Sequence, residues 1–131
     1  MRNFLATTIA VLLIALTGAV AAHAATMEEA IESMCDMARS AYELGAQLRC
    51  NGISEKTAKD IGVDLIDKSA RDIQTFKKYP VLLNLAKDLT STSIHVAYKD
   101  RFECNNFKPN AIMYKAICIT EFTKKLKGRL K

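Results

Sequence analysis

The chain contains 131 residues, of which 50% are hydrophobic, with 19 Lys and Arg residues against 14 Asp and Glu residues and four cysteines. This length fits a short leader followed by one domain with a single hydrophobic core. The net charge of +5 is carried mostly by the last segment, "EFTKKLKGRLK" (121–131). A nucleic-acid-binding domain spreads Lys and Arg over a face with interleaved aromatic side chains, so we exclude that class.

The first 24 residues have the three-part pattern of a secretory signal peptide. A basic residue precedes the apolar stretch "FLATTIAVLLIALT" (4–17), and small residues then end in the A-x-A site Ala22-His23-Ala24. We therefore expect cleavage after Ala24 and export to the periplasm or the medium. Residues 25–131 would then be a single helical domain with a basic C-terminal tail. The alternative is an uncleaved membrane anchor, because the apolar stretch is barely long enough to span a bilayer.

The segment "TMEEAIESMCDMARSAYELGAQLRC" (26–50) predicts the first helix. Thr26 and Glu29 have the spacing of a capping box, and Asn51-Gly52 is a good stop signal. Apolar positions recur every three or four residues and predict one seam that packs against other helices. The seam consists of Met27, Ile31, Met34, Ala38, Ala41, Gly45 and Leu48.

Three further helices follow in the chain. The second is expected from Ser54 to the Tyr79-Pro80 step, because the residue before a proline avoids the helical conformation. Its apolar stripe is Ala58, Ile61, Leu65, Ser69, Ile73 and Phe76. The third covers 81–102, and the fourth runs from a cap at Asn110 to about Lys127. With short connections and no strand-like alternation, the sequence predicts an all-α, up-down four-helix bundle.

The four cysteines are interpreted as two disulfides, because export favours bridges over free thiols or a zinc site. Cys35 and Cys50 share a helix and lie about 22 Å apart, too far for a bridge that needs Cα atoms within about 7 Å. In the expected bundle, pairing Cys50 with Cys104 puts both cysteines at the same end, and pairing Cys35 with Cys118 leaves these two cysteines offset by about 10 Å along the bundle axis. In the remaining alternative, Cys50 and Cys118 are offset by about 12 Å along the axis, and Cys35 and Cys104 by about 22 Å. We favour the former pairing as the structural staples and keep the latter open.

Catalytic chemistry finds little support in the sequence. The chain has no G-x-S-x-G, P-loop, G-x-G-x-x-G or H-E-x-x-H motif. His95 is the one histidine of residues 25–131, and we interpret it as a structural side chain rather than a catalytic base. One histidine and no close cysteine pair argue against a metal site. We expect no enzyme, no catalytic residue, no metal and no cofactor.

The loop "RFECNNFKPN" (101–110) is the candidate binding surface. Two phenylalanines flank two asparagines beside a cysteine, and a bridge there would hold the loop rigid for recognition. The predicted partner-binding residues are Asn105, Asn106, Phe107 and Lys108. Both Phe102 and Phe107 could instead tuck into the end of the bundle. The basic tail is interpreted as a solvated helix end, with contact to an anionic membrane surface or an acidic partner as the alternative.

The segments "LRC" (48–50), "YPV" (79–81) and "ICITEFTKKL" (117–126) resemble the type VI secretion amidase immunity family. Its members are small exported helical proteins that neutralise a cell-wall amidase delivered by a neighbouring bacterium. The resemblance implies a periplasmic, often dimeric inhibitor that occludes the amidase cleft with a projecting loop. This chain departs from the pattern by adding Cys35 and Cys104. A bond between the matched cysteines, Cys50 and Cys118, would overturn the favoured pairing.

A second set of motifs, "C-x-x-A-x-x-A" (35–41), "R-x-x-G-x-S" (49–54) and "AY" (97–98) before a final cysteine, resembles uncharacterised small secreted bacterial helical proteins. It suits a Cys35–Cys118 bridge and implies no function. We therefore expect a small exported protein that binds a protein partner, with immunity to a cell-wall amidase as the first candidate. A periplasmic chaperone, an envelope-stress protein or an envelope domain with an unknown ligand are the alternatives.

Overall fold

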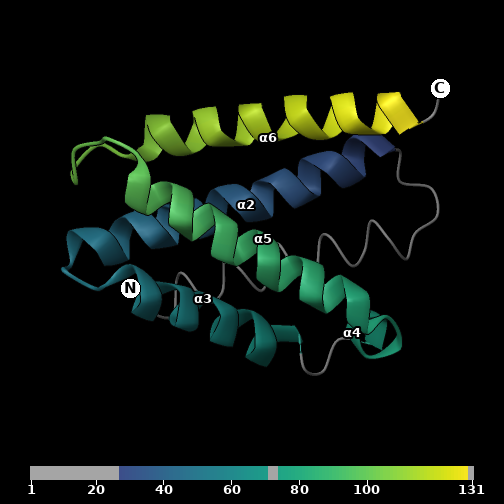
Figure 1. Cartoon of the computed structure of the whole chain (residues 1–131), viewed down its shortest axis with the longest axis horizontal. Helices are drawn as coiled ribbons and strands as arrows, with labels where there is room; N and C mark the ends of the chain where they lie inside the picture. Colours follow the sequence, from purple (N-terminus) through teal and green to yellow (C-terminus); the bar gives the residue numbers. More distant parts are fainter. Residues whose placement is uncertain (1–26, 71–73, 130–131) are drawn as a thin grey trace.

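The computed structural model describes residues 27–70 and 74–129, which are almost entirely helical (Figure 1). The helices are α2 (Met27–Cys50), α3 (Glu55–Ala70), α4 (Gln74–Lys78), α5 (Pro80–Lys99) and α6 (Lys108–Arg129). The all-α prediction is confirmed for this part of the chain. The predicted leader over 1–24 and the predicted cap Thr26 lie outside the described residues.

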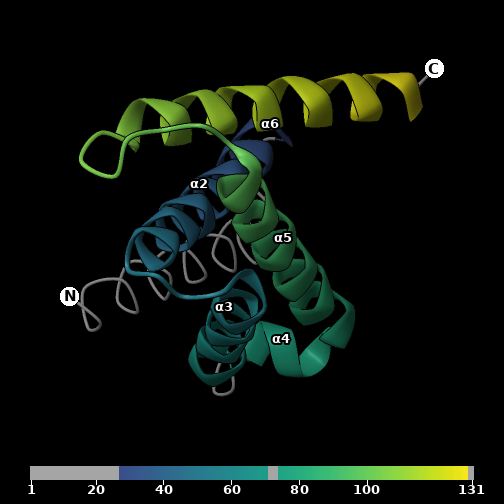
Figure 2. The same ribbon diagram turned by 60° about the vertical axis from the view of Figure 1, so that its left-hand side comes forward.

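α2 is the central helix of the fold. It lies between α6 on one side and the pair α3 and α5 on the other (Figures 1 and 2). Glu28 and Glu29 in its first turn and Arg49 in its last turn complement the helix dipole. Because three helices pack on it, α2 buries side chains around most of its circumference: Ile31, Cys35, Met37, Ala38, Ala41, Tyr42, Leu44 and Ala46. The predicted seam is thus only one of its packed faces.

Two glycines allow α5 to lie close to both α2 and α3. A Cβ atom on Gly45 would stand 3.1 Å from the Cα atom of Ile94, and one on Gly62 would stand 2.6 Å from Ile94 Cδ1. Ile94 is fully buried between these two helices. At Gly45 a larger side chain would meet the Ile94 backbone and push α2 and α5 apart, whereas at Gly62 it would meet the end of the Ile94 side chain, which would have to rotate.

The second predicted helix corresponds to two described elements. The sequence predicted one helix from Ser54 to the Tyr79-Pro80 step, and within that range the structure describes α3 (Glu55–Ala70) and the short α4 (Gln74–Lys78). Residues 71–73, which include Ile73 of the predicted stripe, lie outside the described residues. Phe76 of α4 packs into the core with Ala70 and Ala86, and only 4% of Phe76 is exposed.

α6 forms a separate layer, and a four-helix bundle around one core is not confirmed. α6 packs across α2, at the far side of the molecule from α3 (Figures 1 and 2). Its inward residues join a second cluster of buried side chains built around Tyr42, Ala46, Ala97 and Ala111. Its outward face exposes Ile112, Met113 and Ile117. The helix begins at Lys108 rather than after Asn110, because the amide of Ala111 already bonds the Phe107 carbonyl at 3.1 Å.

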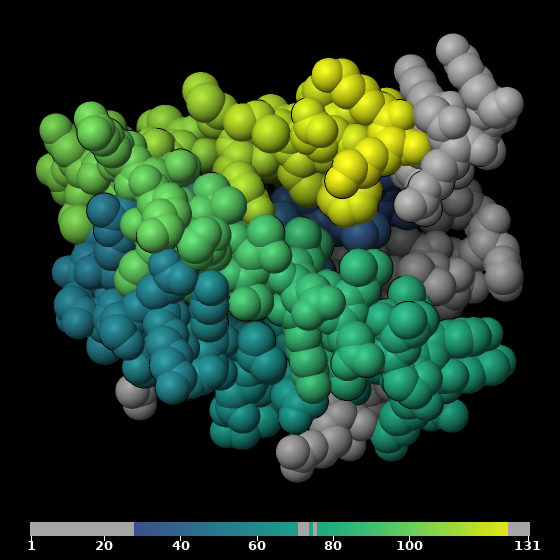
Figure 3. Space-filling view, in the orientation of Figure 1, coloured from purple at the N-terminus to yellow at the C-terminus, as the bar shows by residue number. Residues whose placement is uncertain are grey.

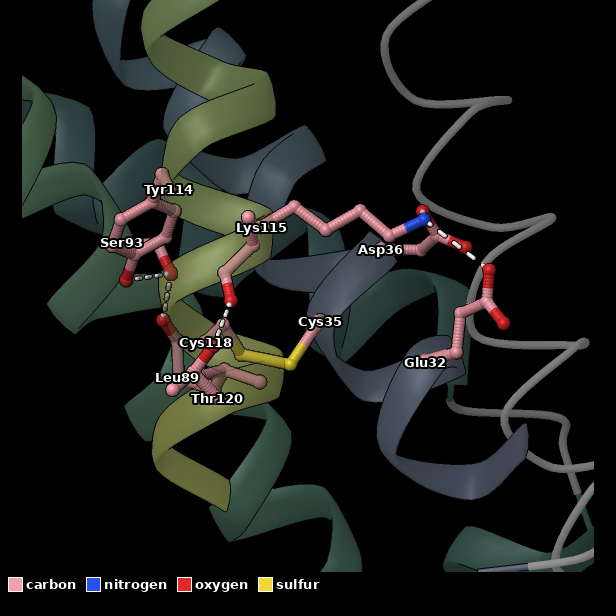
Figure 4. Close-up of a disulfide and its surroundings, with 10 residues drawn as sticks. Glu32, Cys35, Asp36, Leu89, Ser93, Tyr114, Lys115, Cys118 and Thr120 are labelled. Carbon is pink, nitrogen blue, oxygen red and sulfur yellow. Dashed lines mark hydrogen bonds and ion pairs between the residues drawn. A yellow bond between two sulfur atoms is a disulfide. The ribbon is translucent and has the colours of Figure 1, made fainter. Parts of the chain in front are cut away.

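Two disulfides join the helices in the favoured pairing. Cys35 bonds Cys118 and Cys50 bonds Cys104, each with Cα atoms 5.7 Å apart. The alternative pairing is therefore wrong. The first bridge ties α2 to α6, where Lys115 also reaches Asp36 at 2.6 Å (Figure 4). Two such bridges are compatible with an exported protein.

Within the described ranges, none of the helices combines the length and the apolar character needed to cross a bilayer.

Candidate functional site

The candidate site lies where α2 and α5 end and α6 begins (Figure 1). α2 stops in a Schellman motif, in which the Ile53 amide bonds the Leu48 carbonyl and the Gly52 amide bonds the Arg49 carbonyl, both at 3.0 Å. Gly52 has a φ of 78°, the left-handed conformation that this motif requires and that glycine adopts freely. The Asn51-Gly52 stop signal is confirmed, and it fixes the position of Cys50 beside the loop that follows α5.

The loop from Arg101 to Phe107, which we term the stapled loop, is held at three points. Cys104 near its tip is bonded to Cys50 of α2. Across the tip, the Asn106 amide donates to the Glu103 carbonyl at 2.8 Å, so the chain reverses in a tight turn. At its base, Asn110 Nδ2 donates to the Arg101 carbonyl at 3.1 Å. Few backbone conformations of the loop remain compatible with these three constraints.

An aromatic cluster anchors the loop to the helices. The rings of Phe102 and Phe107 meet edge to face at 6.0 Å between centroids, and Phe102 also lies 6.3 Å from the ring of Tyr42. Tyr42 in turn stacks on Tyr114 of α6 at 5.2 Å. Both phenylalanines are half-buried. Phe107, predicted as a partner-binding residue, therefore serves mainly as an anchor in this structure.

Arg49 and Tyr42 tie the end of α5 to α2. Arg49 Nη1 donates to the carbonyls of Ala97 at 3.0 Å and Asp100 at 2.6 Å, and its guanidinium lies 5.0 Å from the Phe102 ring centroid. The Tyr42 hydroxyl donates to Asp100 Oδ2 at 2.7 Å. Burial, together with this bond to a carboxylate, raises the pKa of Tyr42 far above its ordinary value, so the hydroxyl stays a donor. Sequence analysis missed both roles.

The tip of the stapled loop faces solvent. Asn105, Asn106 and Lys108, three of the four predicted partner-binding residues, are exposed. Each asparagine amide offers two donors and an acceptor oxygen, and Lys108 offers a cation. Asn105 and Asn106 thus form a polar tip on the aromatic base of the stapled loop, and Lys108 follows as the first residue of α6. This arrangement suits recognition by hydrogen bonds, with little conformational entropy lost on binding.

His95 lies elsewhere, facing α3. Its Nδ1 atom is 3.0 Å from Glu55 Oε2, and Lys59 lies 3.1 Å from the same oxygen. The His95 and Lys59 hydrogen bonds hold the pKa of the Glu55 carboxyl below its usual range. The contact joins the start of α3 to α5, which is a structural role for this histidine.

A shallow groove between α3 and α5 also carries charged side chains. Its volume is about 400 Å³, and it is lined by Lys56, Lys59, Asp60, Val63, Asp64, Asp67, Lys87 and Ser91. The lysines and carboxylates largely neutralise one another, as Lys87 and Asp67 do at 2.8 Å. Across the described part of the chain, no cluster of His, Cys, Asp or Glu side chains has the arrangement of a metal site. The stapled loop is therefore the stronger candidate.

The chain was compared with family models, curated proteins and solved structures, and none of them matches it.

Proposed function

We propose that the chain is a small exported binding protein that recognises a protein partner through the tip of the stapled loop. The observation that carries this proposal is the combination of an exposed Asn105-Asn106 tip with a covalent and aromatic base. Adaptable loops lose conformational entropy when they bind, and a loop already fixed by a disulfide avoids much of that loss. Exposed asparagines then supply directional hydrogen bonds that select the partner.

Within this class we propose an inhibitor of a cell-wall amidase as the first candidate. The resemblance of residues 48–126 to the amidase immunity family motivates this choice. A rigid, narrow loop that extends from one end of a helical domain is a suitable shape for entering an enzyme cleft. Inhibition would require only occupation of the cleft, so no catalytic residue of this chain would be needed.

A periplasmic chaperone is the second candidate, and the outward face of α6 favours it. Ile112, Met113 and Ile117 are each more than half exposed on that face. A row of exposed aliphatic side chains suits weak contact with unfolded apolar segments. Such contact would not depend on the stapled loop, so the two candidates predict different sensitivities to mutation.

A pull-down from envelope extract with the oxidised protein distinguishes them. We expect capture of one stoichiometric hydrolase that is lost with Asn105→Ala/Asn106→Ala. The matched control is Asn84→Ala, since Asn84 is an exposed asparagine of α5 outside the loop. The captured hydrolase should degrade peptidoglycan more slowly with the wild-type protein than with the loop variant. Many clients captured equally by the wild type and by both asparagine variants, and lost with Ile112→Ser/Ile117→Ser, would support the chaperone instead.

A further inference from the structure

An exposed apolar corner lies at the junction of α4 and α5. Tyr79, Val81 and Leu85 are 47%, 72% and 49% exposed, although neighbouring apolar residues of α5 face the core. Val81 and Leu85 are one helical turn apart and therefore lie on one face. Tyr79 directly precedes α5, so three exposed apolar residues lie close together in the chain where α4 meets α5. This part of the chain is the teal region at the lower right of the space-filling view (Figure 3).

Cations border the apolar corner. Lys77 and Lys78 end α4, and the Lys78 ammonium lies 5.6 Å from the Tyr79 ring centroid. Within the described residues, neither lysine forms an ion pair with a carboxylate, whereas Lys87 is paired with Asp67. The nearest exposed acid along α5 is Asp88, one turn beyond Leu85. Lys77 and Lys78 thus directly precede Tyr79 at the start of α5, and the Lys78 ammonium lies against the Tyr79 ring.

The corner and the stapled loop lie at opposite ends of α5 (Figures 1 and 2). α5 contains 20 residues, so the two features are separated by about 30 Å along its axis. A surface that contacts the apolar corner would leave the loop free on the far side.

We infer that the apolar corner docks on an anionic phospholipid surface, with Tyr79, Val81 and Leu85 inserted among the headgroups and Lys77 and Lys78 contacting lipid phosphates. Exposed aromatic and aliphatic side chains beside lysines are the composition of peripheral membrane contacts. Three side chains are too few for a stable protein interface, which buries roughly 800 Å² per partner. Together with two cations, they suffice for reversible attachment to charged lipid. Docked in this way, the protein presents the stapled loop away from the membrane.

Vesicle co-sedimentation tests this inference with oxidised protein expressed from the full chain. Phosphatidylcholine vesicles with and without phosphatidylglycerol serve as the probes. We expect binding to the anionic vesicles alone and a loss of about fivefold in partition constant for each lysine replaced in Lys77→Gln/Lys78→Gln. Val81→Ser/Leu85→Ser should weaken binding at least as strongly. High salt should weaken the wild type toward the level of the lysine variant, because it screens these charges.

The matched control is Ile112→Ser/Ile117→Ser, which removes two aliphatic side chains of similar exposure from α6. This control should bind anionic vesicles as the wild type does. All of the replaced residues are exposed, and an unchanged melting temperature would show that the variants are folded. The inference would be overturned if the wild-type protein did not bind anionic vesicles, or if the variants of the apolar corner bound them as well as the wild type does. It would also be overturned if the α6 control lost as much binding as the variants of the apolar corner. None of these outcomes bears on the stapled loop, so the proposed function is tested separately.

Discussion

Arg49 at the end of α2 donates a 2.6 Å hydrogen bond to the carbonyl of Asp100, the C-cap residue that directly follows α5. The same guanidinium lies over the Phe102 ring at the base of the stapled loop. One side chain thus connects the last turn of one helix, the last turn of another and the loop between α5 and α6. The loop derives its position from this contact as well as from the adjacent disulfide.

Replacing Arg49 should therefore destabilise the protein. Arg49→Met keeps much of the apolar stem but leaves two carbonyls without their charged donor, at a cost of about 1–3 kcal/mol. Urea denaturation gives the free energy of unfolding directly. Arg101→Gln is the control, because Arg101 is exposed and its side chain makes no hydrogen bond among the described residues. Equal stabilities for the two variants would show that Arg49 does not hold this end together.

The two disulfides should differ in their rates of reduction. Cys104 is exposed, whereas Cys35 is fully buried, so a reductant reaches the Cys50–Cys104 bridge first. Brief treatment with dithiothreitol, followed by alkylation and mass spectrometry, should label Cys50 and Cys104 while Cys35 and Cys118 remain bonded. Earlier labelling of Cys35 and Cys118 would contradict the burial of Cys35 in the packing of α6 on α2.

Opening the Cys50–Cys104 bridge should lower stability as well as loosen the loop. The cysteines are 54 residues apart in the chain, and closing a loop of that length contributes about 4 kcal/mol through the unfolded state. Cys50→Ser/Cys104→Ser should lower the free energy of unfolding by up to that amount. Hydrogen exchange should also accelerate at 103–106 more than within α3. Unchanged hydrogen exchange at 103–106 would show that the aromatic anchors hold the stapled loop in place without the disulfide.

The glycine positions of α2 and α3 should respond differently to alanine. At Gly45 the added Cβ meets the backbone of Ile94, so the helices must separate, which costs about 1–3 kcal/mol. At Gly62 the nearest atom is the end of the Ile94 side chain, which can rotate. The better helix propensity of alanine, about 1 kcal/mol, then offsets much of the strain. The melting temperature of Gly45→Ala should thus be lower than that of Gly62→Ala. The reverse order would contradict the close approach of the α5 backbone to Gly45.

Acid should weaken the contact between α3 and α5. The pKa of Glu55 is held below its ordinary value of 4.5 by His95 and Lys59. A carboxyl group whose pKa is lower in the folded state than in the unfolded state stabilises the fold at pH values above its unfolded-state pKa. This stability is lost as the pH falls through the pKa that the group has in the folded state. The stability difference between wild type and Glu55→Gln should therefore shrink from about pH 6 to about pH 3. Glu121→Gln, at an exposed carboxylate of α6, should show no such convergence.

Sequence patterns predicted the features that depend on chain order and local conformation. The Asn51-Gly52 stop marks the end of α2 beside Cys50, and Pro80 marks the start of α5. The up-down order of the helices then favoured the pairing of Cys50 with Cys104. The exposed asparagines of the stapled loop follow from a polar turn next to a cysteine. These inferences needed no knowledge of how the helices pack against one another.

Features that depend on tertiary packing were missed. Phe76 of α4 packs against Ala86 of α5 in the core, a contact between two helices that the sequence pattern did not specify. The bonds of Arg49 join residues about 50 positions apart in the chain, which no spacing rule anticipates. Val81 and Leu85 lie in the apolar run at the start of the predicted third helix, for which the sequence analysis assigned no exposed face. Only the orientation of α5 shows that their face of the helix is exposed.

Site-specific photo-cross-linking in the bacterial envelope tests the central claim most directly. A photo-reactive amino acid would replace Asn105 at the tip of the stapled loop, and a matched chain would carry it at Asn84 on α5. We predict one cross-linked hydrolase from position 105 and no such product from position 84. A product of the same mass from both positions, or none from position 105, would contradict recognition through the stapled loop.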